Sequence, residues 1–483
     1  MKKLLLSITL LVGFNSFAQL TCATAIELTA DETVSVPELT GTYQAICWGT
    51  AAAAPNAIWY KFTPTQNGEV TVNADLPQNQ SAPFSNDQRV SIATGTCTAL
   101  TCYAGYDDID DTNYNVNYTF PVQSGTTYYI VWDNRWLAEG FDFDFSFVSA
   151  SCIRPNDISI NTPTNITTTS ATLNWAAAIG TPPGYDVEYG VAGFAPGTGT
   201  VASTSTTSVS LTTGLTASSN SEYYLRSDCG TSESAWVGPF TLFLAKTLPY
   251  ANGFETPQLS DGFAAAGWGL GNAASGAQAG TIYYFSSSST TAASNSLLFS
   301  RAISLQANEQ VTLTFYTRLG SATGTNNILK VWVNGLPSAT GATQLGADIT
   351  VSGATYTLQT RTFTATAPGI YYFIFNNVTP IVTAATSLRL DTFNLTSVLS
   401  NDEFLSSEFS VYPNPVNNVI NFSNNVNALV SSVKITDLNG RVVKTLDVNA
   451  TEGQISVSDL ASGMYMLNIT SDKGTAVKKI VKQ

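Results

Sequence analysis

The strongest constraint on the fold of this chain is the alternation of apolar and polar residues. Residues 141–147 read FDFDFSF, which would place four phenylalanines on one face of a strand and the polar side chains on the other. Similar runs at 57–62, 69–72 and 127–132 are separated by turn signals, such as TQNG at 65–68. The pattern predicts an all-β chain built of tandem β-sandwiches.

Length and composition support this fold class. A chain of 483 residues is too long for one small core and predicts several domains. Charged residues make up 11% of the chain, well below the usual proportion of about a quarter. Abundant threonine, valine and aromatic residues are typical of sandwiches. We place domain boundaries at 20–152, 153–245, 246–399 and 401–483.

The absence of histidine excludes several kinds of site. The chain contains no histidine, so a Ser-His-Asp triad, a Cys-His pair and a His-based zinc site are ruled out. The net charge of −14 is concentrated at the N-terminal end, where residues 20–152 carry 15 acidic and 3 basic residues. An acidic chain repels phosphate backbones, so we expect no nucleic-acid partner.

The N-terminus has the pattern of a signal peptide, assigned to residues 1–18. Lys2 and Lys3 precede an apolar segment at 4–14, and SFA at 16–18 is a small-x-small cleavage site. Cleavage after Ala18 would leave Gln19 as the first residue. We therefore expect a protein outside the cytoplasm.

Six cysteines fit an oxidising compartment, where they would form disulfide bonds. Six cysteines allow 15 pairings in principle. Spacing favours Cys97–Cys102 and Cys22–Cys47 in the first domain and Cys152–Cys229 in the second. The alternative, thiolate ligands to a metal, lacks a C-x-x-C motif.

Two segments resemble known modules. The strings IWYKFTPTQNGEVTVNADL, RVSIATGTC and YTFPVQSGTTYYIVWDN in 20–152 resemble the bacterial pre-peptidase C-terminal domain, which implies a non-catalytic accessory module. The strings SATLNWAAA, GYDVEYG and SEYYLRSDCG in 153–245 resemble a fibronectin type III domain. That resemblance implies a seven-stranded sandwich with Trp175 in its core and either Tyr223 or Tyr224 as the buried tyrosine of a later strand.

The third segment, 246–399, resembles the jelly-roll modules of cleaved adhesins and MAM-like domains. The resemblance rests on LPYANGFE at its start, LRLDTFNLTSV at its end and plausible strands between them. It implies that Glu255 and Asp391 lie close together near a calcium ion. A solvent-facing glutamate and an edge-strand aspartate are the alternative. Residues 269–294 are rich in Ala, Gly and Ser, which predicts loops.

The last segment, 401–483, carries the most specific strings. FSVYPNPVNNVINFS, VKITDLNGRVVKTL, ISVSDLASGMYMLNITSDKG and AVKKIVKQ resemble, in order and spacing, the type A C-terminal sorting domain of type IX secretion. The resemblance implies a Gram-negative bacterium, with this domain read by the outer-membrane secretion machinery. The chain would then be secreted or displayed on the cell surface, via the periplasm and outer membrane.

Two further features suggest ligands. Asp107, Asp108, Asp110 and Asp111 crowd four carboxylates into five positions, and a calcium ion would relieve their repulsion. The run lacks the glycine and final glutamate of an EF-hand, so a solvated acidic loop is the alternative. Four tryptophans are candidate platforms for sugar rings, with core packing as the alternative for each: Trp132, Trp136, Trp268 and Trp332.

These features predict a non-catalytic binding or adhesion protein, with polysaccharide or a surface protein as its partner and calcium as its only expected cofactor. One alternative is a secreted carbohydrate-active enzyme, or an accessory carbohydrate-binding protein, that relies on carboxylates. The other is a passive spacer. Because no sequence motif selects a catalytic pair of carboxylates, we predict no enzyme activity.

Overall fold

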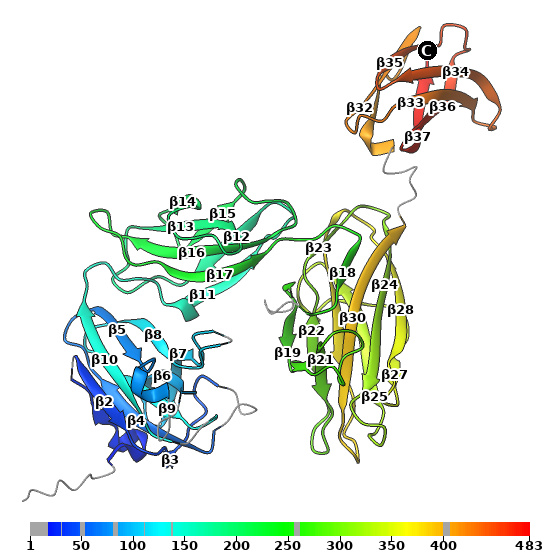
Figure 1. The fold of residues 1–483 in the computed structure, drawn as a ribbon. Coiled ribbons are helices and arrows are strands. Elements are labelled where there is room, and N and C mark those ends of the chain that lie inside the picture. Colours follow the sequence, from blue (N-terminus) through cyan, green and yellow to red (C-terminus); the bar gives the residue numbers. More distant parts are fainter. Residues whose placement is uncertain are drawn as a thin grey trace, which may run out of the picture. The chain divides into compact units, whose positions relative to one another are not determined.

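The computed structural model describes residues 18–29, 31–48, 54–80, 86–110, 112–136, 139–255, 261–398 and 406–483. Most of the predicted signal peptide, residues 1–17, lies outside these ranges. The described strands pair into four two-layered β-sandwiches (Figure 1), which confirms the all-β prediction. The chain divides into two compact units, the first up to residue 242 apart from 166–168 and 217–219, and the second holding the remainder.

The first sandwich packs a sheet of order β1-β4-β9-β6-β7, with β3 beside β4, on a sheet of order β2-β10-β5-β8. The strands are β1 (Ile26–Glu27), β2 (Glu32–Val36), β3 (Gly41–Thr42), β4 (Asn56–Phe62), β5 (Gly68–Asn73), β6 (Arg89–Thr96), β7 (Ala99–Tyr106), β8 (Asn117–Val122), β9 (Tyr128–Asp133) and β10 (Phe141–Ser149). The described part of this sandwich also contains the short 3-10 helices η1 (Ala18–Leu20), η2 (Cys22–Thr24) and η4 (Pro77–Gln80). Phe141, Phe143 and Phe145 are buried, as the alternation predicts.

Two disulfide bonds in this sandwich correct the predicted pairing. Cys22 is bonded to Cys97 and Cys47 to Cys102, so the predictions Cys97–Cys102 and Cys22–Cys47 are wrong. Strands β6 and β7 form a hairpin in which Cys97 lies at the turn, whereas Cys102 lies further along, opposite Ala93. The two cysteines therefore meet different N-terminal segments, although only four residues separate them in the sequence.

The second sandwich packs a sheet of order β11-β12-β15 on a sheet of order β14-β13-β16-β17. Its strands are β11 (Ile160–Thr164), β12 (Ala171–Trp175), β13 (Gly184–Val191), β14 (Thr200–Thr204), β15 (Ser208–Leu211), β16 (Asn220–Asp228) and β17 (Val237–Phe243), preceded by η5 (Asp157–Ser159). Trp175 and Tyr223 are buried, whereas Tyr224 is half-buried. Cys152 is bonded to Cys229, the pairing that the sequence predicts.

The third sandwich packs a sheet of order β20-β21-β30-β24-β28, with β18 beside β30, on a sheet of order β19-β22-β29-β25-β26. In the second sheet β23 pairs with β29 and β27 with β25. The strands are β18 (Tyr250–Asn252), β19 (Ala264–Ala266), β20 (Gly269–Asn272), β21 (Ile282–Ser287), β22 (Ser296–Phe299), β23 (Ile303–Leu305), β24 (Gln310–Leu319), β25 (Asn327–Asn334), β26 (Thr343–Gln344), β27 (Ile349–Val351), β28 (Thr357–Thr364), β29 (Gly369–Asn377) and β30 (Ser387–Val398). Rings such as Phe315, Phe375 and Phe393 fill the space between the sheets.

The fourth sandwich packs a sheet of order β31-β32-β35 on a sheet of order β34-β33-β36-β37. The strands are β31 (Phe409–Tyr412), β32 (Val419–Asn424), β33 (Val430–Asp437), β34 (Val442–Ala450), β35 (Gly453–Ser456), β36 (Gly463–Ser471) and β37 (Gly474–Lys482). The predicted hairpin turn closes where Gly440 N donates to Asp437 O at 2.9 Å. Among the described residues, no helix is long and apolar enough to cross a membrane.

Candidate functional site

The candidate site lies on the solvent face of the third sandwich, where β21 and β30 run side by side. Successive side chains of a strand point to opposite faces, and Tyr284 and Leu390 are buried in the core. Tyr283 and Phe285 of β21 and Arg389 of β30 therefore point away from the core. Sequence reasoning missed β21, because it predicted loops throughout 269–294, where the structure has β20 and β21.

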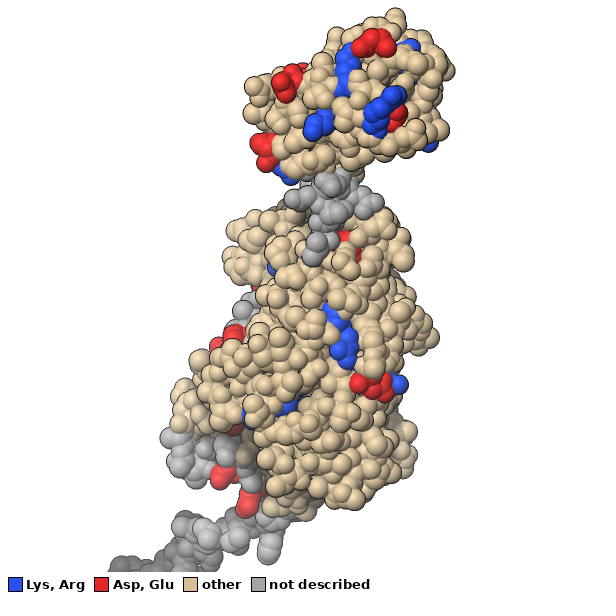
Figure 2. Space-filling model, turned by 90° about the vertical axis from the view of Figure 1, so that its right-hand side faces the viewer, with Lys and Arg blue, Asp and Glu red and all other residues tan. Residues whose placement is uncertain are grey.

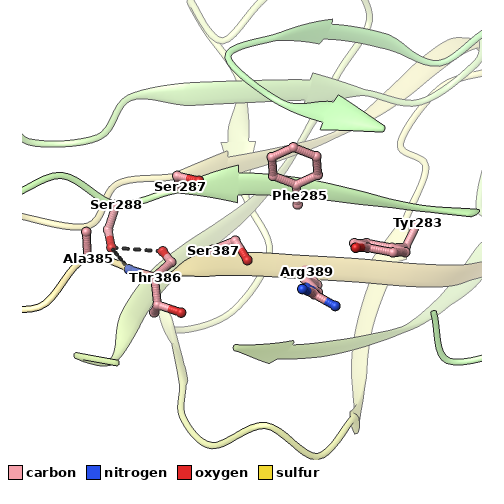
Figure 3. A pocket seen from close by; sticks show the side chains of 8 residues that line it. All are labelled: Tyr283, Phe285, Ser287, Ser288, Ala385, Thr386, Ser387 and Arg389. Atoms are coloured by element: carbon pink, nitrogen blue, oxygen red, sulfur yellow. Dashed lines mark hydrogen bonds between the residues drawn. The ribbon is translucent and has the colours of Figure 1, made fainter. Parts of the chain in front are cut away.

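These outward side chains line a shallow cavity of about 330 Å³. Figure 3 shows Phe285 and Tyr283 on one side, Arg389 beside them, and hydroxyl-bearing side chains at the other end. Ser288 Oγ donates to Thr386 O at 3.0 Å and accepts from Thr386 N at 3.1 Å, which ties the two strand ends together. The full lining is Tyr283, Phe285, Ser287, Ser288, Ala385, Thr386, Ser387 and Arg389.

The aromatic rings of the cavity lie over glycines of the neighbouring edge strand. Gly269 pairs with Phe285 and Gly271 pairs with Tyr283 in the β20–β21 ladder. A Cβ atom at Gly271 would overlap the Tyr283 ring, and one at Gly269 would lie 3.1 Å from the Phe285 ring. The glycines thus leave room for both rings to lie against the sheet.

Arg389 is held by Tyr283 and by the loop 273–281, which joins β20 to β21. The centre of its guanidinium lies 4.7 Å from the centroid of the Tyr283 ring, and its Nη1 donates to Gly276 O at 3.3 Å. The same carbonyl accepts from Arg318 Nη2 at 3.0 Å and from Tyr356 Oη at 2.9 Å. Donors from three directions therefore fix this loop beside the cavity.

The two predicted calcium ligands of this sandwich, Glu255 and Asp391, both accept hydrogen bonds from the backbone of the same loop. Asp391 Oδ2 accepts from Gln278 N at 2.6 Å and from Ala279 N at 3.3 Å. Glu255 accepts from Thr281 N at 3.0 Å. The resemblance to cleaved adhesins led us to expect the two carboxylates close together, and they bind neighbouring peptide groups of one loop.

Both carboxylates accept further hydrogen bonds from the backbone. Asp391 Oδ1 accepts a further N–H from Thr392 at 2.6 Å, and Glu255 a further one from Ile282 at 3.0 Å. Burial raises the pKa of Asp391, and the backbone hydrogen bonds oppose that rise. Hydrogen bonds to the two carboxylates therefore hold this loop in place.

The acidic run of the first sandwich is only partly brought together. Oxygens of Asp107 and Asp108 lie within 4.8 Å of each other and of an oxygen of Asp87, which sequence reasoning missed because it lies on another segment. Asp110 instead forms a turn, with Oδ1 accepting from Thr112 N at 2.8 Å. Asp111 lies outside the described residues.

Burial and repulsion act on the carboxylates of this cluster. Burial raises the pKa of Asp107, although Trp136 Nε1 donates to both of its oxygens at 3.1 and 3.2 Å. Burial also raises the pKa of Asp87, and the charge of Asp107 adds to that effect. Three crowded carboxylate oxygens are the ligand type that calcium prefers.

The predicted tryptophan platforms divide into two kinds. Trp132 and Trp268 are buried in the cores of their sandwiches, so these two predictions are wrong. Trp136 is exposed but hydrogen-bonded to Asp107, and Trp332 is half-buried on β25. The rings that line a cavity on the third sandwich belong instead to Tyr283 and Phe285.

A second cavity, of about 340 Å³, lies in the first unit and is lined by rings that include Tyr118 and Trp236. Its charged groups already have partners. Arg154 Nη2 lies 2.7 Å from Glu69 Oε2, and Asp157 Oδ1 accepts from Tyr118 Oη at 2.6 Å. Glu69 thus balances the charge of Arg154, whereas Arg389 of the third sandwich forms no ion pair among the described residues.

Residues 410–483 match the family model of the secretion system C-terminal sorting domain. No curated protein matches the chain. Among solved structures, the K1 cleaved adhesin domain of Lys-gingipain from Porphyromonas gingivalis W83 is 16% identical, with 31% of this chain and 98% of that chain covered at a TM-score of 0.26. The CBM22-1 xylan-binding domain from Paenibacillus barcinonensis Xyn10C is 17% identical, with 31% and 93% covered at a TM-score of 0.24.

The match at the C-terminus agrees with the geometry of the fourth sandwich. The segment at 413–415 is joined to the last strand, because Asn414 Oδ1 accepts from Val481 N at 2.9 Å and Asn414 Nδ2 donates to Lys479 O at 2.8 Å. The predicted hairpin and the final strand are both present. Residues 410–483 are a C-terminal sorting domain of type IX secretion, and the chain is exported to the cell surface or secreted.

Proposed function

We propose that this exported chain is a non-catalytic glycan-binding protein and that the cavity on the third sandwich is its binding site. One observation carries the proposal. The partly exposed ring of Phe285 shares a cavity with the hydroxyls of Ser287, Ser387 and Thr386 and with the guanidinium of Arg389. A sugar ring has an apolar C–H face and a rim of hydroxyls, and this lining offers a partner for each.

The composition of the cavity favours binding over catalysis. Hydrolysis of a glycosidic bond requires two carboxyl groups placed across the scissile bond. None of the described residues that line the cavity carries a carboxyl or a thiol group, and the chain contains no histidine. A bound sugar would meet hydrogen-bond donors and acceptors there, but its hydroxyl side chains have no carboxylate or histidine in the lining to activate them.

The other sandwiches complete the proposal. The second sandwich, with its buried Trp175 and Tyr223, supports the resemblance to a fibronectin type III domain. For the first sandwich, the resemblance of its sequence to the pre-peptidase C-terminal domain implies a non-catalytic accessory module. In this account both serve as spacers or secondary contacts, and residues 401–483 engage the outer-membrane secretion machinery.

We also propose that calcium binds at Asp87, Asp107 and Asp108 and stabilises the first sandwich. Their mutual approach supports this proposal, since a divalent cation removes the repulsion between them. After a chelator has removed bound ions, added calcium would raise the melting temperature of the wild type. It would leave the melting temperature of Asp108→Asn unchanged. An unchanged melting temperature of the wild type would contradict this proposal and leave the glycan site untouched.

A glycan array tests the main proposal. The full chain would bind a subset of polysaccharides, and Phe285→Ala would lower the affinity at least about tenfold through loss of the stacking surface. Leu358→Ala is the matched control, because Leu358 is 51% exposed on β28 of the same sheet and lies outside the cavity. Equal binding by both variants, or no binding by the wild type, would refute the proposed site.

A further inference from the structure

We infer that the cavity of the third sandwich takes an acidic saccharide, a sugar unit with a carboxylate or sulfate group that Arg389 binds. The inference rests on the proposed glycan-binding function and adds the charge class of the ligand. The inference is based on Arg389, which forms no ion pair with any described residue.

Arg389 lacks an ion-pair partner among the described residues. The carboxylates of the third sandwich that form ion pairs do so with other cations, Asp261 with Arg301 at 2.6 Å and Asp348 with Lys330 at 3.9 Å. The hydrogen bond from Arg389 Nη1 to Gly276 O is long, at 3.3 Å, and its Nε is buried without a hydrogen-bond partner. An anion in the cavity would give the Arg389 guanidinium the ion-pair partner that the described residues do not supply.

The guanidinium is also held in a fixed orientation. Tyr283 covers one of its faces at 4.7 Å, and Phe285 lies directly opposite Arg389 in the strand ladder. A planar guanidinium that is fixed in this way can donate two parallel hydrogen bonds to one carboxylate or sulfate. Arg318, which pairs with Arg389 in the β24–β30 ladder, adds a second positive charge nearby.

The carboxylate of Asp391, close to Arg389 in the sequence, binds backbone N–H groups. Asp391 follows Arg389 by two residues, but three backbone N–H groups surround its carboxylate, those of Gln278, Ala279 and Thr392. The described lining residues contribute no acidic group. An anion in the cavity would therefore meet a guanidinium and hydroxyls rather than an exposed carboxylate.

The overall charge of the chain makes this local arrangement informative. With a net charge of −14, the chain as a whole repels polyanions, so non-specific attraction would not mimic binding at Arg389. Figure 2 shows charged side chains scattered sparsely over a mostly uncharged surface of the third sandwich. Binding of an acidic polysaccharide would then require a specific site.

The test compares three polysaccharides on the full chain by titration calorimetry at 150 mM salt. The probes are polygalacturonate, the same polymer after reduction of its carboxyl groups to alcohols, and dextran sulfate. We expect at least one anionic probe to bind at least about tenfold more tightly than the reduced polymer, because a charge-assisted bidentate contact is lost on reduction. The polygalacturonate and dextran sulfate arms show whether the bound group is a carboxylate or a sulfate.

Substitutions of Arg389 test whether this residue causes the preference for the charged probe. Arg389→Gln would abolish the preference for the charged probe, and Arg389→Lys, which keeps the charge but not the bidentate geometry, would retain only part of it. Arg361→Gln is the matched control, since Arg361 lies on β28 of the same sheet, outside the cavity, and donates to the carbonyls of Thr360 and Ala347. Melting temperatures of all variants would show whether each is folded.

The outcomes separate the two proposals. Equal binding of neutral and charged polymers, or a charge preference that survives Arg389→Gln in the folded variant, would overturn the acidic ligand and leave glycan binding intact. Binding of neutral glycans alone on the array would do the same. Absence of binding to every glycan on the array would overturn the proposed function itself.

Discussion

Phe285 of β21 lies directly opposite Arg389 of β30 on the solvent face of the third sandwich. The two residues are far apart in sequence, and antiparallel pairing alone brings the ring and the guanidinium together. A slip of β21 by one residue against β30 would turn Phe285 into the core while Arg389 stayed on the solvent face. The site therefore depends on the packing of the sheet, through the inward-facing neighbours Tyr284 and Leu390.

Gly271→Ala is expected to weaken glycan binding without touching the ligand. A methyl group at this position would overlap the Tyr283 ring and move it away from Arg389. We expect a several-fold loss of affinity and a small change in melting temperature. Gly335→Ala is the control, because its added Cβ would lie 3.7 Å from the nearest atom, Ile370 O. Equal affinities of the two variants would show that the position of Tyr283 is unimportant.

The buried ion pair Arg89–Asp133 is expected to be a major contributor to the stability of the first sandwich. Arg89 Nε lies 3.0 Å from both oxygens of Asp133, and Arg89 Nη2 lies 2.8 Å from Oδ1. Asp133→Asn would leave a buried guanidinium without its counter-charge, at a cost of about 3–5 kcal/mol. Urea unfolding measures this loss.

An exposed pair provides the comparison for that experiment. Lys61 Nζ lies 3.4 Å from Glu27 Oε2, and both side chains are substantially exposed. Glu27→Gln is expected to change the free energy of unfolding by less than about 1 kcal/mol. Similar losses for Glu27→Gln and Asp133→Asn would contradict the role assigned to burial.

The acidic cluster predicts a pH dependence of stability. Because the pKa of Asp107 is raised in the folded protein, its carboxyl binds a proton more tightly there than in the unfolded chain. The stability contributed by Asp107 therefore falls as pH rises from the ordinary value near 3.8 through the raised pKa. Asp107→Asn removes this titration, so the stability of the wild type relative to the variant should decline across this window. A relative stability that rises with pH in urea unfolding would contradict the burial argument.

Removal of residues 406–483 is expected to block export. The fourth sandwich has a core of its own, and it contains the matched sorting domain. The truncated chain should accumulate in the periplasm, as measured by cell fractionation, while full-length Phe285→Ala reaches the outside normally. Normal secretion of the truncated chain would refute the sorting role.

Much of the architecture could be predicted from local patterns. The FDFDFSF run places its first three phenylalanines in the core because a strand has a period of two. The DLNG turn at 437–440 follows from its residue types, and Asp437 Oδ1 accepts from Asn439 N at 3.0 Å as such turns require. These features depend on neighbours in the sequence.

Features that depend on long-range pairing were not predictable in the same way. Cys97 and Cys102 are neighbours in sequence, but the β6–β7 hairpin directs them to different partners. Asp87 joins Asp107 and Asp108 only through the fold. The Gly- and Ala-rich composition of 269–294 concealed β20 and β21, because glycines there serve to accommodate the rings of Tyr283 and Phe285.

The most direct measurement is a crystal structure of the full chain with the tightest-binding oligosaccharide from the array. We predict a sugar ring against Phe285, with a hydrogen bond to Arg389 and further bonds to the hydroxyls at the ends of β21 and β30. A ligand bound instead beside Trp136 or Trp332, with this cavity filled only by water, would contradict the central claim.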